Sequence, residues 1–168
     1  MISLSLNIVM LVVILIVVIP FSLFIWADKS EKAKKKKKFL DVAREQNLKL
    51  SVVEYWNNSC LGYDDHENTL IYINIMDSVT RFQKVDLDDV RKCVINRITR
   101  EFKNGDKHFS EMSRLDLEFT FISNAAPVKI SLYSTDEGFS QNEEMPRAEK
   151  WLAFIDKHKY NKNNVSAA

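Results

Sequence analysis

The chain has 168 residues, with 24 Lys and Arg side chains against 23 Asp and Glu, and a formal net charge of +1. This balance excludes a nucleic-acid-binding protein held by bulk positive charge, and it also excludes an acidic disordered chain. The length allows one domain of ordinary size with a short appendage. The 46% of hydrophobic residues are enough to build a packed core.

The first 27 residues carry no ionisable side chain. From Ile8 to Trp26 every residue is apolar except Pro20 and Ser22. A helix of this length spans about 28 Å, which is close to the hydrocarbon thickness of a bilayer. We therefore expect a transmembrane signal anchor over residues 1–27. A cleaved signal peptide fits less well, because no Lys or Arg precedes the run and no small-x-small site follows it.

A lysine-rich segment comes directly after the apolar run. Residues 28–38 hold seven lysines against Asp28 and Glu31, a net charge of +5. The positive-inside rule places this side in the cytoplasm, so we expect a single-pass protein of the cell (inner) membrane with its N-terminus outside. We predict a Lys-rich juxtamembrane helix over residues 28–47, with Asn47 as its stop. Its candidate lipid or phosphate contacts are Lys34, Lys35, Lys36, Lys37 and Lys38.

The remainder changes from helical to strand periodicity. We predict seven strands, at residues 48–56, 60–63, 69–76, 84–87, 91–102, 108–122 and 128–132. Asn104-Gly105 is a strong hairpin signal between the fifth and sixth strands. A last amphipathic helix is predicted over residues 146–159, because its apolar side chains recur at helical spacing on one face. The tail at 160–168 is polar, and we expect it to be disordered.

Two stretches carry a resemblance to a known fold. The strand, turn and strand at residues 61–72 and the short strand and polar turn at residues 85–90 resemble the early strands of bacterial pleckstrin-homology-like domains. The whole chain resembles small bacterial single-span membrane proteins with such a cytoplasmic domain. Over residues 48–159 this resemblance implies a mainly β sandwich or partial barrel of about seven strands with a C-terminal capping α-helix. It implies no functional residue, since one fold hosts many functions.

Few residues carry a signal for catalysis or metal binding. The cluster Asp64, Asp65, His66, Glu67 and Asn68 could bind a divalent cation, but it lacks the spacing and glycine of a calcium loop, and a solvated turn explains it better. Cys60 and Cys93 have no zinc spacing, so we expect two free, buried thiols in a reducing cytoplasm. The scattered glycines form no phosphate-binding loop. We therefore expect no cofactor, no metal and no enzymatic activity.

The predicted hairpin between residues 91 and 122 contains the main basic stretch of the domain. Because alternate residues of a strand point to opposite faces, its charges are split between two faces. Residues 39–168 together hold 17 basic and 21 acidic side chains, net −4, which opposes general attachment to anionic lipid. The candidate lipid or phosphate contacts of this hairpin are Arg97, Arg100 and Lys103. Trp56 and Trp151 are predicted as core residues.

These features favour a membrane-anchored, non-enzymatic binding or scaffold module that presents a sheet edge, or a groove between sheet and helix, to a protein partner. The alternative is a binder of lipid headgroups on the inner leaflet. A hydrolase or metalloenzyme is a weaker third hypothesis. The expected partners are the bilayer, through the N-terminal helix, and an unidentified protein, with no nucleic acid. The sequence does not indicate the oligomeric state.

Overall fold

The computed structural model describes residues 6–76, 79–104, 107–137 and 143–159. The chain divides into two compact units, Met1–Val42 and Ala43–Ala168. The predicted tail at 160–168 lies outside the described residues, as does Gly105 of the predicted hairpin turn.

Helix α1 (Leu6–Glu45) runs through the predicted boundary at residue 27, and Pro20 lies inside it. Several apolar side chains of its first half, among them Val13 and Ile16, are exposed. Among the described residues, however, no helix combines the length and the apolar character needed to cross a membrane. This finding corrects the prediction of a transmembrane helix.

Helix α1 ends in a Schellman motif. Asn47 has a φ of 60°, and its N–H donates to the carbonyl of Arg44 at 2.9 Å, while the N–H of Leu48 donates to the carbonyl of Ala43 at 3.0 Å. Asparagine tolerates this left-handed conformation better than most residues, so the helix stops here. The sequence predicts the same stop.

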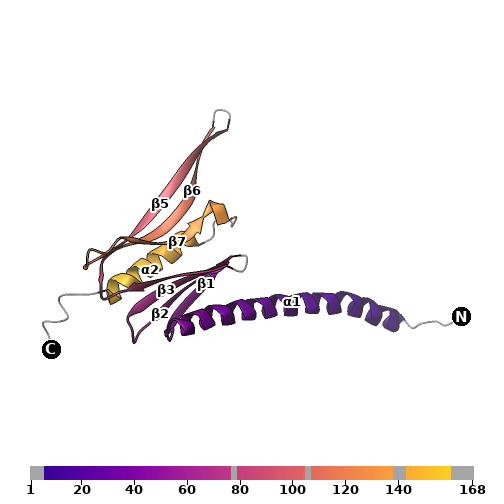
Figure 1. The fold of residues 1–168 in the computed structure, drawn as a ribbon. Helices are drawn as coiled ribbons and strands as arrows, with labels where there is room; N and C mark the ends of the chain where they lie inside the picture. Colours follow the sequence, from indigo (N-terminus) through magenta and orange to yellow (C-terminus); the bar gives the residue numbers. More distant parts are fainter. Residues whose placement is uncertain (1–5, 77–78, 105–106, 138–142, 160–168) are drawn as a thin grey trace. The chain divides into compact units, whose positions relative to one another are not determined.

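Two antiparallel sheets follow the helix. β1 (Val52–Trp56), β2 (Ser59–Asp64), β3 (Thr69–Met76) and β4 (Val79–Asp86) form a four-stranded sheet in chain order. β5 (Val90–Asn104), β6 (Lys107–Phe121) and β7 (Val128–Ser134) form a three-stranded sheet. A short 3-10 helix, η1 (Thr135–Glu137), follows β7, and α2 (Glu144–His158) lies between the two sheets in Figure 1. The predicted seven strands and C-terminal helix are confirmed.

The core joins both sheets to α2. Ala148, Trp151 and Ile155 of α2 are almost fully buried, and they belong to one apolar cluster with side chains from both sheets. Trp56 and Trp151 are both core residues, as predicted. The members of this cluster from the first sheet include Leu61, Leu70 and Val85, and those from the second include Leu117, Phe119 and Ile130.

The hairpin of β5 and β6 extends beyond the third strand of its sheet (Figure 1). The two strands pair as far as Asn104 and Lys107, whereas β7 pairs only with the part of β6 between Arg114 and Phe119. A β-bulge separates the two parts at Ile98 and Thr99. We call residues 99–104 and 107–112 the arm.

Candidate functional site: a groove between β1 and α2

Glu54 of β1 connects the first sheet to α2. Its carboxylate accepts hydrogen bonds from Arg147 Nε at 3.0 Å, from Lys150 Nζ at 2.8 Å and from Trp151 Nε1 at 2.9 Å. The three donors lie on one face of the helix, because positions 147, 150 and 151 are spaced at i, i+3 and i+4. This face meets β1. We call Glu54 with these three donors the clamp.

The electrostatics of the clamp favour the ionised carboxylate. Burial by itself raises the pKa of Glu54, but the hydrogen bonds from Lys150, Arg147 and Trp151, with the charge of Lys150, outweigh burial and lower the pKa below its usual value. The guanidinium of Arg147 also lies over the ring of Trp56, 4.8 Å from its centroid, a cation–π contact. The clamp therefore fixes the distance between β1 and α2.

A hollow of about 300 Å³ lies beside the clamp, between β1 and α2. Val52 contributes from the strand, where it is 37% exposed. The helix contributes apolar side chains in the middle and a lysine on either side of them along its axis. We call this hollow the groove, and its lining residues are Val52, Lys150, Trp151, Ala153, Phe154 and Lys157.

The strand that borders the groove is an edge strand. β1 pairs with β2 from Val52 to Trp56 and stands at the end of the strand order in its sheet. The side of β1 away from β2 therefore has no strand partner among the described elements. An edge strand of this kind can accept a further strand. The groove thus combines a sheet edge with an apolar floor and two cations.

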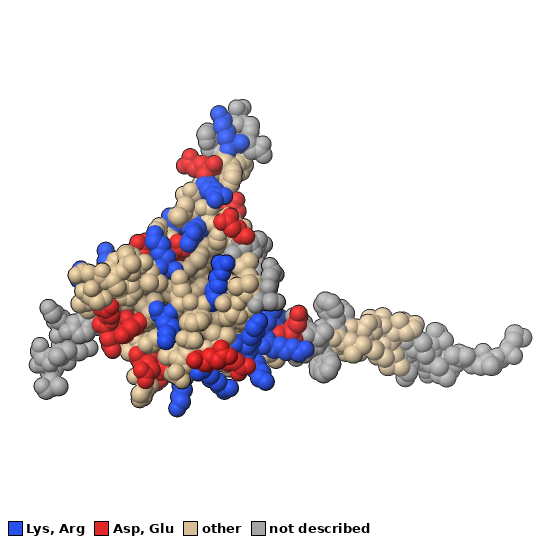
Figure 2. Space-filling view, in the orientation of Figure 1, with Lys and Arg blue, Asp and Glu red and all other residues tan. Residues whose placement is uncertain are grey.

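The predicted basic residues belong to two different units of the chain. Those from Lys34 to Lys38 are exposed on α1, in the first unit of the chain. Arg97, Arg100 and Lys103 are exposed on β5, where strand alternation places Arg100 on the face opposite to the other two. Figure 2 shows Lys and Arg interspersed with Asp and Glu over the visible face of the domain. Arg100 lines a second hollow of about 200 Å³, beside Phe102 and Glu111.

The acidic turn after β2 has a structural role. Asp64 is buried, and its carboxylate accepts hydrogen bonds from the backbone N–H groups of Lys49, His66 and Glu67. Burial by itself raises the pKa of Asp64, but these three bonds outweigh it and lower the pKa. No group of three or more His, Cys, Asp or Glu residues with a metal-binding arrangement occurs in the part of the chain that the structure describes.

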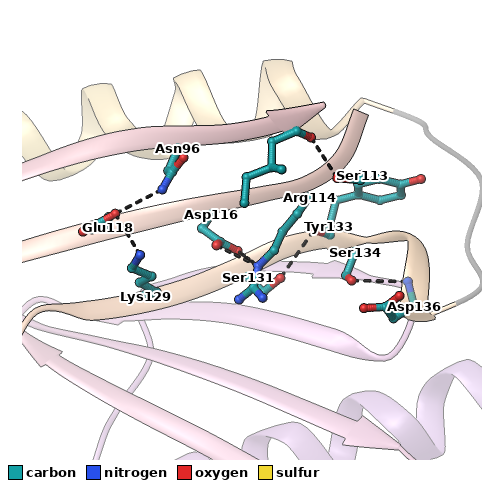
Figure 3. Close-up of polar contacts among 11 residues, drawn as sticks. Asn96, Ser113, Arg114, Asp116, Glu118, Lys129, Ser131, Tyr133, Ser134 and Asp136 are labelled. Atoms are coloured by element: carbon teal, nitrogen blue, oxygen red, sulfur yellow. Dashed lines mark hydrogen bonds and ion pairs between the residues drawn. The ribbon is translucent and has the colours of Figure 1, made fainter. Parts of the chain in front are cut away.

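A second polar cluster lies on the second sheet, on the face opposite to the core (Figure 3). Asp116 is only 2% exposed, and both its oxygens accept from Arg114 Nε, at 2.9 and 2.8 Å. Glu118 accepts from Asn96 Nδ2 at 3.2 Å and pairs with Lys129 at 3.3 Å. Because these carboxylates are bound by neighbouring side chains, the cluster stabilises the sheet. Ser113, Ser131 and Ser134 bond to backbone groups in the same region.

The two cysteines are free and buried. Burial raises the pKa of both thiols to about 12, and a nearby Asp156 adds to the effect at Cys93. A thiol with so high a pKa is a poor nucleophile at neutral pH, because the thiolate is the reactive form.

Sequence reasoning proposed a sheet edge or a groove between sheet and helix, but it missed the residues that form the groove. Glu54 is an acidic residue within an otherwise apolar strand, and Lys150 and Lys157 recur at i and i+7 on the last helix. Both are weak signals that many surface residues share. The recurrence shows that the lysines share a helix face, but the sequence does not show which strand that face meets.

Comparison of the chain with models of protein families, with curated proteins and with solved structures gives no match.

Proposed function

We propose that the domain is a non-enzymatic binding module that takes an extended segment of a partner protein as an added strand beside β1. The groove is the observation that carries this proposal. Strand addition uses the unpaired backbone of an edge strand for affinity and nearby pockets for specificity. β1 supplies the edge, and the lining of apolar side chains with two lysines supplies the pocket.

The same proposal includes kinship with pleckstrin-homology-like domains. The order of four strands, three strands and a terminal helix supports it, together with the resemblance at residues 61–72 and 85–90. The location of the domain at the cytoplasmic face of the inner membrane stays a prediction, and it depended on the transmembrane helix that is corrected above.

Binding of lipid headgroups is the alternative, and it has weaker support. Its candidate residues on β5 are divided between two faces, and acidic side chains such as Glu101 and Glu111 lie among them. The net charge of −4 over residues 39–168 also opposes an anionic surface.

Site-specific photo-crosslinking in cells tests the proposal. A photoreactive residue replaces Ala153, an exposed residue of the groove, in the full-length chain, and the matched control replaces Ala125, an exposed residue of the loop between β6 and β7. We expect a protein adduct from position 153 that position 125 does not give. Val52→Glu places a charge in the groove and should abolish this adduct.

Three outcomes would contradict the proposal. One is an adduct of equal yield from both positions, and another is an adduct that survives Val52→Glu. A lipid adduct in place of a protein adduct would support the alternative.

A further inference from the structure

The groove has a regular charge pattern along α2. Lys150, the pair Ala153 and Phe154, and Lys157 lie at i, i+3, i+4 and i+7, so they share one face of the helix. The two lysines stand about 10 Å apart along the helix axis. Lys157 is exposed, Ala153 is exposed and Phe154 is half-buried. The helix therefore offers cation, apolar surface and cation in that order.

Lys150 can bind a second anion although it belongs to the clamp. Its side chain remains 65% exposed while its ammonium group donates to Glu54 at 2.8 Å. A lysine ammonium group has three N–H donors, so the bond to Glu54 leaves donors that point to solvent. Both ends of the groove can thus receive a carboxylate.

The geometry of a strand sets the spacing of a matching ligand. Alternate residues of an extended chain face the same way, and positions i and i+4 lie about 13 Å apart. Flexible lysine side chains cover the difference of about 3 Å between this distance and their own separation along the helix. The residue at i+2 then lies over Ala153 and Phe154, where an aliphatic side chain contacts apolar surface.

We propose that the groove recognises an extended peptide with two acidic residues four positions apart and an apolar residue midway between them. This inference rests on the proposed function and names the chemistry of its partner. A polyphosphate chain does not fit the groove, because it has no apolar group to contact Ala153 and Phe154. It would also be repelled by the net charge of −4 over residues 39–168. Charge at both ends sets the register of the added strand.

Synthetic peptides and the full-length chain test the inference by fluorescence anisotropy. The probe is a labelled nine-residue peptide with the centre Asp-Thr-Leu-Thr-Asp. Two matched peptides serve as controls: Asp-Leu-Thr-Thr-Asp keeps the composition and moves the leucine to the other face, and Lys-Thr-Leu-Thr-Lys reverses the charges. We expect the probe to bind about tenfold more tightly than either control.

Charge reversal on the protein provides the decisive comparison. Lys157→Glu should weaken probe binding about tenfold and improve binding of the lysine peptide. Lys84→Glu makes the same charge change at an exposed position on β4 and should leave binding unchanged. Thermal melting of both variants checks that each is folded.

The possible failures separate this inference from the proposed function. If all three peptides bind equally and Val52→Glu abolishes their binding, the groove binds peptides but the acidic pattern is wrong. Absence of probe binding at millimolar concentration also overturns the pattern, and the photo-crosslink from position 153 then decides the proposed function separately. Equal weakening by Lys157→Glu and Lys84→Glu would show a nonspecific charge effect and would overturn the inference.

Discussion

Asparagine occupies most of the described non-glycine positions with a positive φ, namely Asn47, Asn57, Asn68 and Asn124. Asparagine reaches this conformation at low cost, and unlike glycine it keeps a polar side chain. Asn68 uses that side chain fully. It accepts from the Tyr63 hydroxyl at 2.9 Å and donates to Asp88 at 2.6 Å and to the carbonyl of His158 at 3.2 Å. It therefore joins the turn after β2, the turn after β4 and the end of α2.

Asn68→Gly should separate these two roles. Glycine keeps the positive φ but loses the hydrogen bonds, so we expect a loss of about 1–3 kcal/mol in the free energy of unfolding. Asn57→Gly is the matched control, because the structure describes no side-chain hydrogen bond for Asn57, and its effect should stay within about 0.5 kcal/mol. Urea denaturation followed by circular dichroism measures both. Equal effects of the two variants would contradict the role of the Asn68 side chain.

The raised pKa of Cys60 and Cys93 leads to a second prediction at this scale. With a pKa of about 12, only about one thiol in ten thousand is ionised at pH 8. We expect Ellman's reagent to label both thiols slowly in the folded protein and rapidly in guanidinium chloride. A thiol introduced by Ala125→Cys, at an exposed loop position, is the reference for fast labelling. Comparable rates for the native thiols would show that they are accessible.

At the scale of the element, the clamp links the stability of the domain to pH. Because the pKa of Glu54 is lowered by folding, the ionised carboxylate stabilises the folded state above the unfolded pKa of about 4.5. This contribution is lost as the pH falls through the lower, folded pKa. At pH 7 we expect Glu54→Gln to lower the free energy of unfolding by about 1–3 kcal/mol.

The difference in the free energy of unfolding between the wild-type protein and Glu54→Gln should shrink as the pH falls below about 4.5. Urea denaturation across the pH range measures this difference. Asp64 also has a lowered pKa, but it is present in both proteins, so its effect cancels in the difference. A difference that stays constant with pH would mean that the charge of Glu54 does not contribute.

The elements differ in how well the sequence predicts them. β3 is predicted in full because its apolar side chains form a continuous run that is buried on both faces. β4 is predicted only from residue 84, because the side chains of residues 79–84 are exposed or half-buried and include Thr80, Arg81 and Gln83. β4 is an edge strand, so its pairing with β3 forms the strand without a hydrophobic pattern.

The candidate site is less predictable than the fold. The sequence predicts that Trp56 and Trp151 belong to the core, and both do, because large aromatic side chains have few other stable positions. Glu54 and Arg147 are separated by 93 residues, and no local pattern indicates that they meet. The predicted basic residues are exposed charges, whose clustering depends on strand register and on the bulge at Ile98 and Thr99.

At the scale of the molecule, one apolar cluster joins α2 to both sheets of the unit from Ala43 onward. The buried face of α2 contributes to a single cluster with side chains of both sheets. The first sheet also buries Cys60, Ile71 and Ile73 outside this cluster, but loss of the α2 side chains would expose apolar side chains of both sheets. The second unit should therefore unfold as one cooperative transition.

Ile155→Ala tests this cooperativity. Ile155 is fully buried on α2, and its truncation should lower the free energy of unfolding by about 2–5 kcal/mol. Amide hydrogen exchange measured by mass spectrometry should then report the same loss of protection in β3 and β6, although the two strands belong to different sheets. Ile122→Ala, at an exposed position, is the control. Loss of protection confined to one sheet would contradict a cluster that couples the two sheets.

The regular pairing of the two strands in the arm allows this hairpin to be shortened or lengthened. Beyond the bulge, β5 and β6 pair residue by residue, from Thr99 with Met112 to Asn104 with Lys107, and β7 does not reach them. Deletion of two residues from each strand removes whole cross-strand pairs and leaves every remaining side chain on its original face. Met112, at the base of the arm, belongs to the core, so deletions on the side of this pair nearer the hairpin tip leave the packing of the core unchanged. The arm is therefore the place where insertions and deletions in multiples of two residues per strand preserve the fold.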